Sequence, residues 1–507
     1  MEYGSGSFPE TKDWHQSMDA GEPWAKSFSG RLFDFDAPHS GQLPVWLVLI
    51  AAAGGSAVAL ADFNALYICI SLLACVFIMI DFRIGVALLV VVMPVSASNL
   101  FPHKIAGITG LNPLNLLLVA TLIAWFLQRT GKIGVAQLAP TPLRWWYAFP
   151  MVVAAGLGVS HVSEIPMFFS AIDLISFDSA SGYLRDMLFR PLFMILFAVL
   201  VGAAVVHSRD SETVLFPMLF SIWLMGLMTL AFVYLSGASI SGLSSSAARG
   251  FFSPLGMHAN DLGRCYAIAY ALMLFTFAAC DDFHLRFVLA VSMGMVIVAL
   301  VFTFSRGAFL GFVVVNVLFL LSRRKIGTLL LGALMFAGIL FFLPGAVYER
   351  ISAGWGIGLN AISAGRVDEI WLPLIPEFLD SPIYGHGLGA ILWSKAMRAG
   401  TILQVSHPHN AYLQAALDMG FVGLILHGAY FTHVWKGFRR LYKEPSLSPA
   451  RRGFYEGAAV GLLSFLLTGF AGSSLMPVPE QCFLWLAIGM MYGEQARISG
   501  AMRVKSR

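Results

Sequence analysis

The sequence has few charged residues and few cysteines. Only 12% of its 507 residues are charged, whereas 58% are hydrophobic, a balance that excludes an ordinary soluble globular protein. The net charge of +4 is spread through the connecting segments and gives no reason to expect a nucleic-acid partner. The five cysteines follow no metal-ligand spacing, so we expect them to serve apolar packing: Cys69, Cys75, Cys265, Cys280 and Cys482.

The N-terminal segment lacks the features of a cleaved signal peptide, which are a basic start followed by an apolar core. Residues 1–42 are polar, slightly acidic and rich in glycine, serine and proline. We therefore expect a flexible cytoplasmic tail.

Long hydrophobic runs fill most of the remaining chain. A helix needs roughly 20 mostly apolar residues to cross a bilayer core of ~30 Å. The sequence thus predicts an all-α fold, a polytopic transmembrane helix bundle with about fourteen spans, twelve to fourteen being compatible with the pattern. The predicted spans are 43–61, 63–80, 84–98, 111–127, 145–161, 187–207, 214–236, 264–280, 287–304, 308–321, 326–343, 411–434, 454–472 and 480–492.

Basic residues in the short connections set the orientation. They cluster at 129–132, 322–325, 435–452 and 503–507, and such clusters favour the cytoplasmic side. With both termini inside, all of these clusters are cytoplasmic. The predicted organisation is helices 1–11 over residues 43–343, a large periplasmic loop at 344–410, helices 12–14 over 411–493 and a basic cytoplasmic tail at 494–507.

The loop at 344–410 is long enough that a function or disorder is expected. Within it, "IWLPLIPEF" places Ile370, Leu374 and Phe378 at helical spacing, which predicts an amphipathic helix in the outer membrane interface, bent by its prolines. The glycines of "GHGLGA" at 385–390 fit tight turns, and a phosphate-binding backbone is the less favoured interpretation.

Arginines gather on the predicted outer side, against the positive-inside tendency. A single one is explained as an interfacial anchor, but the group needs another reason. The guanidinium group keeps its charge and matches phosphate oxygens with a fork of donors. The cluster therefore suggests a lipid diphosphate presented from the bilayer. It comprises Arg185, Arg190, Arg249, Arg264, Arg306, Arg350, Arg366 and Arg398.

Outer-face motifs then occur in order along the chain. They are "RGFFSPLGMHANDLG" at Arg249–Gly263, "TFSRGAFLGF" at Thr303–Phe312, "GRVDEIW" at Gly365–Trp371 with "SPIYGHGLGA" at Ser381–Ala390, and "HPHNAYLQAALDMGFVGLIL" at His407–Leu426. Together they resemble the signature of the bacterial O-antigen ligase and polysaccharide polymerase superfamily. The resemblance covers roughly residues 249–426, and the earlier part of the chain shares only its hydrophobic spans.

The resemblance implies a membrane glycosyltransferase, GT-C-like in fold, in the bacterial inner membrane with its active site on the periplasmic side. Its donor would be an undecaprenyl-diphosphate-linked glycan. The acceptor would be a hydroxyl of another lipid-linked repeat unit in a polymerase of O-antigen or exopolysaccharide, or of the lipid A core in a ligase. Other implied partners are the lipid bilayer and a chain-length regulator and flippase of the same pathway.

The resemblance also assigns residues. By motif, Arg306 and His409 are the expected catalytic residues, and Arg249, Arg306 and Arg366 are expected to bind the donor diphosphate. Supporting roles fall to Asn410, His407, Ser305 and Gly307. The segment after Arg249 departs from the family pattern, because Asn260 is displaced and His258 is an additional candidate.

The chemistry can also be argued from the residues. Cleaving the bond between an anomeric carbon and a diphosphate leaves negative charge, which enzymes stabilise with metals or fixed cations. No Asp-x-Asp pair occurs in the predicted outer segments, so we expect arginines in that role, with no metal and no cofactor. The acceptor must lose a proton, and histidine suits a general base. His409 precedes a predicted helix, whose dipole favours neutral imidazole.

Structural interpretations remain open beside these. His409 and Asn410 suit capping of the following helix, and Ser305 and Gly307 suit a short turn. Asp368 and Glu369 are expected to be solvated, with one of them orienting His409 as the alternative. A non-enzymatic lipid-linked glycan transporter is a third class of function, but transport favours charges distributed through the bilayer.

Overall fold

The fold is given by a computed structural model that describes residues 54–56, 63–96, 98–99, 101–102, 104–105, 108–109, 112–128, 135–171, 175, 177–208, 214–237, 239, 242–243, 251–323, 345–472 and 474–505. The predicted tail at 1–42, most of the predicted span 43–61, the predicted span 326–343 and Arg249 lie outside the described residues. The elements below belong to one compact unit, residues 55–507.

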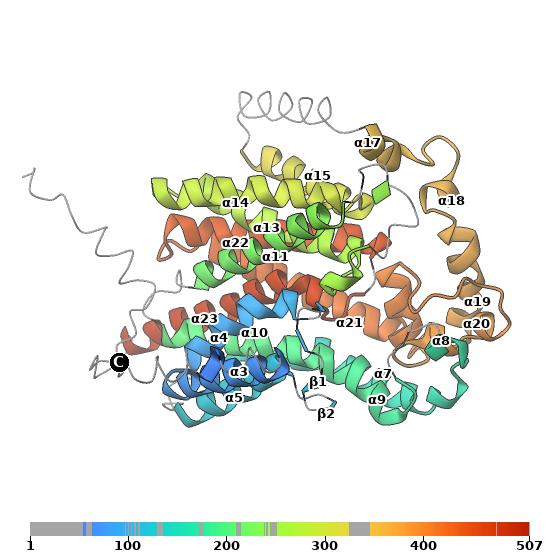
Figure 1. Cartoon of the computed structure of the whole chain (residues 1–507), viewed down its shortest axis with the longest axis horizontal. Helices are drawn as coiled ribbons and strands as arrows, with labels where there is room; N and C mark the ends of the chain where they lie inside the picture. The colour runs from blue at the N-terminus through green and yellow to red at the C-terminus, as the bar shows by residue number, and fades with distance from the viewer. Residues whose placement is uncertain are drawn as a thin grey trace, which may run out of the picture. The chain divides into compact units, whose positions relative to one another are not determined.

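Long α-helices lying side by side make up the unit, as the sequence predicts (Figure 1). A single antiparallel pair, β1 (Lys104–Ile105) with β2 (Ile108–Thr109), is the exception among the described residues. The helices of the first half are α3 (Phe63–Ile80), α4 (Phe82–Val92), α5 (Pro113–Gln128), α6 (Val135–Leu138), α7 (Phe149–Val159), α8 (Phe168–Ala171), α9 (Ala180–Leu184), α10 (Arg190–His207) and α11 (Leu215–Leu235). The π-helices η2 (Pro142–Ala148) and η4 (Arg185–Phe189) lead into α7 and α10.

The second half carries the motifs. Its long helices are α13 (Ala259–Ala279), α14 (Phe283–Phe302), α15 (Arg306–Arg323), α21 (Ala411–Tyr442), α22 (Pro449–Thr468) and α23 (Cys482–Lys505). Between α15 and α21 lie α17 (Gly345–Ser352), α18 (Leu359–Ile362), the π-helix η8 (Val367–Trp371), α19 (Leu372–Asp380), the 3₁₀-helix η9 (Ala390–Trp393) and α20 (Lys395–Arg398). These short helices gather at one end of the long ones (Figure 1).

By length and composition, seven described helices can cross a membrane, and α3, α4 and α5 contribute shorter apolar segments. The chain is therefore a polytopic membrane protein, as predicted. Each predicted span inside the described ranges falls on a helix. The largest differences from the predicted bounds are at two C-terminal ends, because α21 continues to Tyr442 and α23 to Lys505. Polar contacts hold the extension of α23, since Arg451 Nη1 lies 3.3 Å from Glu494 Oε1.

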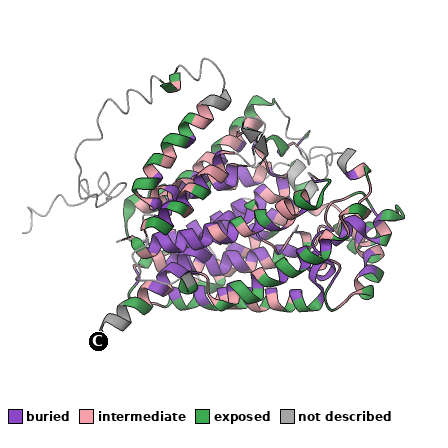
Figure 2. Cartoon of the chain, turned by 90° about the horizontal axis from the view of Figure 1, so that it is seen from below, coloured by how far each residue is buried: buried purple, intermediate pink, exposed green. Residues whose placement is uncertain are grey.

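Small residues allow the central helices to approach closely. Added Cβ atoms at Gly453 and Gly457 of α22 would each lie 2.5 Å from a carbonyl oxygen of α13. Helices α10 and α23 also approach closely, because a Cβ at Gly489 would lie 2.3 Å from the Ala198 carbonyl oxygen. Close backbone packing replaces the hydrophobic driving force that lipid cannot supply between helices. The buried core runs along these helices (Figure 2).

The segment predicted to form a helix in the outer interface is helical, as η8 and α19. Ile370 and Leu374 are 1% and 0% exposed, and Phe378 packs against Phe421 with ring centroids 5.0 Å apart. The apolar residues whose spacing predicted the helix therefore pack on the protein. The period alone could not reveal this, because the opposite side of α19 is also apolar, with Leu372 and Leu379 exposed.

The glycine turn at 385–390 is docked on α21. Asp418 is buried and its Oδ1 accepts hydrogen bonds from the backbone N–H groups of Gly389 and Ala390, both at 3.0 Å. The Gly387 N–H donates to the Asp418 carbonyl at 3.0 Å. Gly385 and Gly387 have φ of 72° and 96°, a region that favours glycine. These amides fasten the loop to α21, which supports the tight-turn interpretation.

Candidate active site

A cavity of about 320 Å³ opens where the first turns of α13 and α15 meet the α18–η8 segment. Its polar lining contains three arginines, Arg264, Arg306 and Arg366, with His258 and Asn260. Its apolar lining includes Phe302, Phe304, Leu359, Ile362, Trp371 and Phe470. A cavity lined both by guanidinium groups and by hydrocarbon side chains fits an amphipathic anion.

Arg306 is the first residue of α15, and a tight turn aims it at the cavity. Phe304 has a left-handed φ of 48°, and Ser305 Oγ accepts the Ala308 N–H at 3.3 Å. Ser305 therefore caps the helix. The Arg306 Nη1 donates to the Ile362 carbonyl at 3.0 Å. This bond holds one side of the guanidinium group against α18, and Gly307 lines the cavity beside it.

Arg366 reaches the cavity from the opposite wall. It is the N-cap residue of η8, and the two residues before it have left-handed φ values, 59° at Ala364 and 85° at Gly365. This turn directs the chain from α18 into η8. The Trp371 Nε1 then donates to the Pro408 carbonyl at 2.8 Å. The cavity wall is thereby joined to the histidine segment at 407–409.

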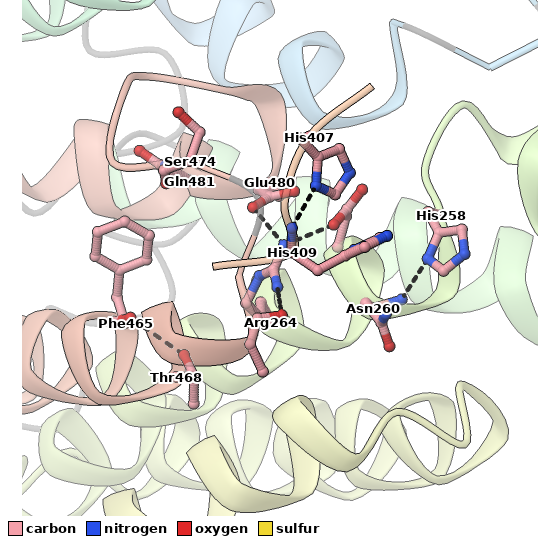
Figure 3. A network of polar contacts seen from close by, with 12 residues as sticks. His258, Asn260, Arg264, His407, His409, Phe465, Thr468, Ser474, Glu480 and Gln481 are labelled. Atoms are coloured by element: carbon pink, nitrogen blue, oxygen red, sulfur yellow. Dashed lines mark hydrogen bonds and ion pairs between the residues drawn. The ribbon is translucent and has the colours of Figure 1, made fainter. Parts of the chain in front are cut away.

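Arg264, one of the outer-face arginines noted in the sequence, forms a buried ion network with two carboxylates that sequence reasoning did not assign to the site. Its side chain is 6% exposed, and its Nη2 lies 2.6 Å from Asp261 Oδ1 and 2.7 Å from Glu480 Oε1. Its Nη1 donates to the Ala471 carbonyl at 3.4 Å. Figure 3 shows this network beside the histidines. The partners anchor the guanidinium group while it faces the cavity.

His258 begins α13 on the same wall. Its Nδ1 accepts the Asn260 N–H at 3.2 Å, so the histidine caps the helix. Both residues line the cavity. The additional candidate noted in the sequence therefore lies with the arginines, and part of its role is structural.

His407 and His409 lie together ahead of α21. Their ring centroids are 4.2 Å apart, and the His409 N–H donates to His407 Nδ1 at 3.3 Å (Figure 3). His409 has a left-handed φ of 53°. Such strain in a non-glycine residue is often stored at functional sites. Asn410 Oδ1 accepts the Tyr412 and Leu413 N–H groups at 3.1 and 3.2 Å, so it caps α21.

Electrostatics connect His407 to the cavity. Burial lowers the pKa of His407 to about 4; Glu480 opposes this change, whereas Arg264, Arg366 and His258 reinforce it. Neutral His407 accepts at Nδ1 and therefore carries its proton on Nε2. In that tautomer it holds the His409 backbone in its strained conformation.

The structure thus brings together most of the expected residues. Arg306, Arg366 and Gly307 line the cavity, and His407 and His409 lie beside its ion network (Figure 3). His407 and His409 are not lining residues of the cavity itself. Arg249 lies outside the described residues. Asp368 and Glu369 are exposed, and the carboxylate that acts on His407 is that of Glu480.

A signal for the missed network does exist in the sequence. Arg264, Asp261 and Glu480 all lie at edges of hydrophobic spans, where ionisable residues usually have a partner or a function. Asp261 and Arg264 also have the helical i, i+3 spacing of an ion pair. The pairing of Arg264 with Glu480 spans 216 positions, which local patterns cannot reveal.

The arrangement can bind an anion and accept a proton. Arginines on two walls suit a diphosphate, and the adjacent histidine pair offers neutral imidazole nitrogen. Among the described residues, no group of three or more His, Cys, Asp or Glu side chains is arranged to hold a metal ion.

Comparison with known proteins bears on the second half of the chain. Residues 290–428 match the family model described as O-antigen ligase. That segment contains Arg306, Arg366, His407 and His409. No curated protein matches the chain. Family members are glycosyltransferase-like enzymes, ligases or polymerases. Residues 290–428 therefore match the O-antigen ligase family within a multi-pass membrane protein, which is consistent with the O-antigen ligase and polysaccharide polymerase superfamily.

Proposed function

We propose that this protein is a polysaccharide polymerase of the bacterial inner membrane. It transfers a glycan from undecaprenyl diphosphate to a hydroxyl of another lipid-linked repeat unit at the periplasmic face. The observation that carries the proposal is the cavity in which Arg264, Arg306 and Arg366 line the same space as apolar side chains, next to the histidine pair. A lipid diphosphate has the matching composition, with two charged phosphates attached to a hydrocarbon chain.

In this proposal the arginines stabilise the leaving group. The bond between the anomeric carbon and the diphosphate oxygen breaks, and negative charge grows on that oxygen. Arg306 and Arg366 approach from opposite walls and donate hydrogen bonds to the phosphates, while Arg264 lines the cavity as part of the ion network with Asp261 and Glu480. Fixed cations are effective here because they need no reorganisation as the charge develops. Arg249 is proposed as a further ligand on the resemblance alone.

His409 is the proposed general base. The acceptor oxygen forms the new bond to the anomeric carbon, and its proton passes to the imidazole of His409. The N-terminus of α21 and the nearby arginines favour neutral imidazole before the reaction. A bound diphosphate adds negative charge, which raises the basicity of the histidines when the substrate is in place. His407 positions His409 through the bond at Nδ1.

A glycan gel tests the proposal. A strain lacking the gene is complemented, at matched membrane levels, with wild type, with His409→Ala or with the control His284→Ala. The control alters an exposed histidine at the start of α14. We expect wild type and the control to restore a ladder, and His409→Ala to leave a single lipid-linked repeat unit. A ladder with His409→Ala would reject His409 as the base.

The second candidate is an O-antigen ligase, which the description of the matching family favours. A ligase passes finished glycan to a lipid A core or another acceptor. The same gel separates the two, because loss of a ligase leaves long lipid-linked chains, whereas loss of a polymerase leaves single repeat units. Accumulation of long chains in the deletion strain would replace the polymerase assignment by the ligase.

A further inference from the structure

The outward side of α19 is an unusually apolar surface for a connecting segment. Leu372, Ile375 and Leu379 follow one another at helical spacing and are 52%, 44% and 63% exposed. Ile383, just after the helix, is 54% exposed. We call these residues the α19 face. Four aliphatic side chains turned away from the protein need a partner that is itself apolar.

The α19 face is continuous with the surface of α21. The Phe421 N–H donates to the Pro382 carbonyl at 2.8 Å, and the Val422 N–H donates to the Ile383 carbonyl at 3.2 Å. These bonds occur where α21 kinks at Gly420, with φ 63°. At the kink, the N–H groups of Phe421 and Val422 therefore donate hydrogen bonds to the segment after α19 in place of hydrogen bonds within the helix. Phe421 and Ile425, below the kink, are 51% and 67% exposed.

The position of this junction along α21 indicates its depth. Helix α21 is a candidate membrane span, and its far end carries Trp435, Lys436, Arg439 and Arg440, which suit a membrane boundary. With a rise of ~1.5 Å per residue, Phe421 lies about 21 Å along the helix from Trp435. That distance falls inside the ~30 Å hydrocarbon core. The segment bonded to Phe421 is therefore at membrane depth.

Charge along the loop fits the same placement. The exposed residues from Leu372 to Leu379 are all apolar. Charges begin at Asp380, which pairs with Lys395 at the start of α20, and continue with Arg398, which pairs with Glu164. The exposed side chains of α19 are thus apolar up to Leu379, and the ion pairs lie after them in the chain, as expected of an element lying along a membrane surface.

We propose that α19 is an interfacial membrane helix, and that the α19 face contacts the acyl chains of the leaflet on the side of the cavity. This contact goes beyond the proposed catalytic function and does not depend on it. Through η8, which precedes α19 directly, it fixes Arg366 at a defined depth relative to the lipid headgroups. The cavity is thereby held at the level where a membrane-bound anion would present its charge.

Spin labels can test this placement in the full-length protein. Cys69 and Cys75, the cysteines that are not buried, are replaced by serine. A nitroxide is attached at Ile375→Cys or Leu379→Cys, with Ala399→Cys as the control, an exposed position directly after α20 and next to the ion-paired Arg398. The protein is placed in phosphatidylcholine and phosphatidylglycerol vesicles, and collision rates with oxygen and with a water-soluble nickel complex are compared.

We expect the ratio of oxygen to nickel collisions to be several-fold higher at 375 and 379 than at 399. Equal ratios at the three positions would place α19 in water and overturn the proposal. Labels at 375 and 379 that are shielded from both reagents and broadened by a second spin would instead indicate contact with another copy of the chain, and would also overturn it. None of these readings requires glycosyl transfer, so they stand apart from the test of catalysis.

Discussion

At the scale of single residues, the motif residues of the candidate site have two kinds of role. Some face the cavity, and others fix the helix ends that carry them. Ser305 and Asn410 serve as helix caps, so their place in the motifs has a structural cause. Arg306 and Arg366 face the cavity from two walls. Substitutions should therefore have different consequences for transfer and for folding.

Arg306 is expected to be essential for transfer. We predict that Arg306→Ala and Arg306→Lys each lower the rate roughly 10²- to 10³-fold, the usual cost of losing one donor to developing negative charge. Lysine fails because an ammonium group cannot reproduce the guanidinium fork. Transfer from a purified lipid-linked donor in vesicles measures the effect. Arg398→Lys, at an arginine outside the cavity, should retain nearly full activity; equal losses in both variants would contradict the assignment.

His407 should make stability depend on pH. Because its pKa falls from 6.5 to about 4 on folding, the unfolded chain binds more protons between these values, and stability decreases as the pH falls from about 6.5 to about 4. His407→Gln removes this contribution. Melting temperatures in detergent at pH 7.0, 5.5 and 4.5 should decrease more steeply for wild type than for the variant. Parallel decreases would show that His407 is already protonated in the folded protein.

At the scale of elements, helix ends are joined across the site by polar contacts inside an apolar bundle. Arg264 links α13 to the 3₁₀-helix η11 (Pro479–Gln481), and Asp418 links α21 to the glycine turn. Burying a charge is costly unless it is paired. These contacts therefore fix relative positions that apolar packing leaves less defined.

Breaking the Arg264 network should destabilise the fold. Glu480→Gln leaves the buried guanidinium group with one carboxylate fewer, and we expect a loss of about 3–5 kcal/mol. The triple variant Asp261→Asn, Arg264→Met, Glu480→Leu should recover much of that stability, because it removes all three charges of the network, yet remain inactive. Thermal unfolding and transfer assays on the same preparations measure both effects. A triple variant as unstable as Glu480→Gln would show that the network does not hold the helices by charge pairing.

The kink of α21 should require glycine at 420. A Cβ there would lie 2.3 Å from the Ile383 carbonyl group, in a left-handed backbone conformation. We predict that Gly420→Ala lowers the melting temperature and exposes the 381–385 segment to proteolysis. Gly428→Ala on the same helix is the matched control, since a Cβ there meets no atom within 4 Å. Similar behaviour of both variants would mean that α21 straightens at no cost.

At the scale of the whole molecule, α21 connects the site to the basic segment at 435–452. The sequence predicts opposite sides of the membrane for these two regions. We expect an impermeant maleimide to label Ala399→Cys, but not Ser446→Cys, in intact cells whose outer membrane has been made permeable. Both positions are exposed in the structure. Labelling of Ser446→Cys alone would invert the orientation and reject a periplasmic site.

The sequence by itself determined the class of the protein and predicted which residues form its site. Hydropathy and charge clustering are properties of short segments, so the spans, the arginine-rich side and the histidine motif could be recognised without coordinates. The motifs also predicted that Arg306 and Arg366 would share one cavity.

Only the tertiary structure decided what joins these parts. The Arg264–Glu480 pair spans 216 positions, and packing alone brings its members together. The side of α19 that packs on the protein could not be predicted from the sequence for another reason. Both sides of that helix are apolar, so the spacing of its apolar residues does not show which side faces protein and which faces lipid. Likewise, the amides of the glycine turn are occupied by Asp418, because α21 lies against that turn only in the folded chain.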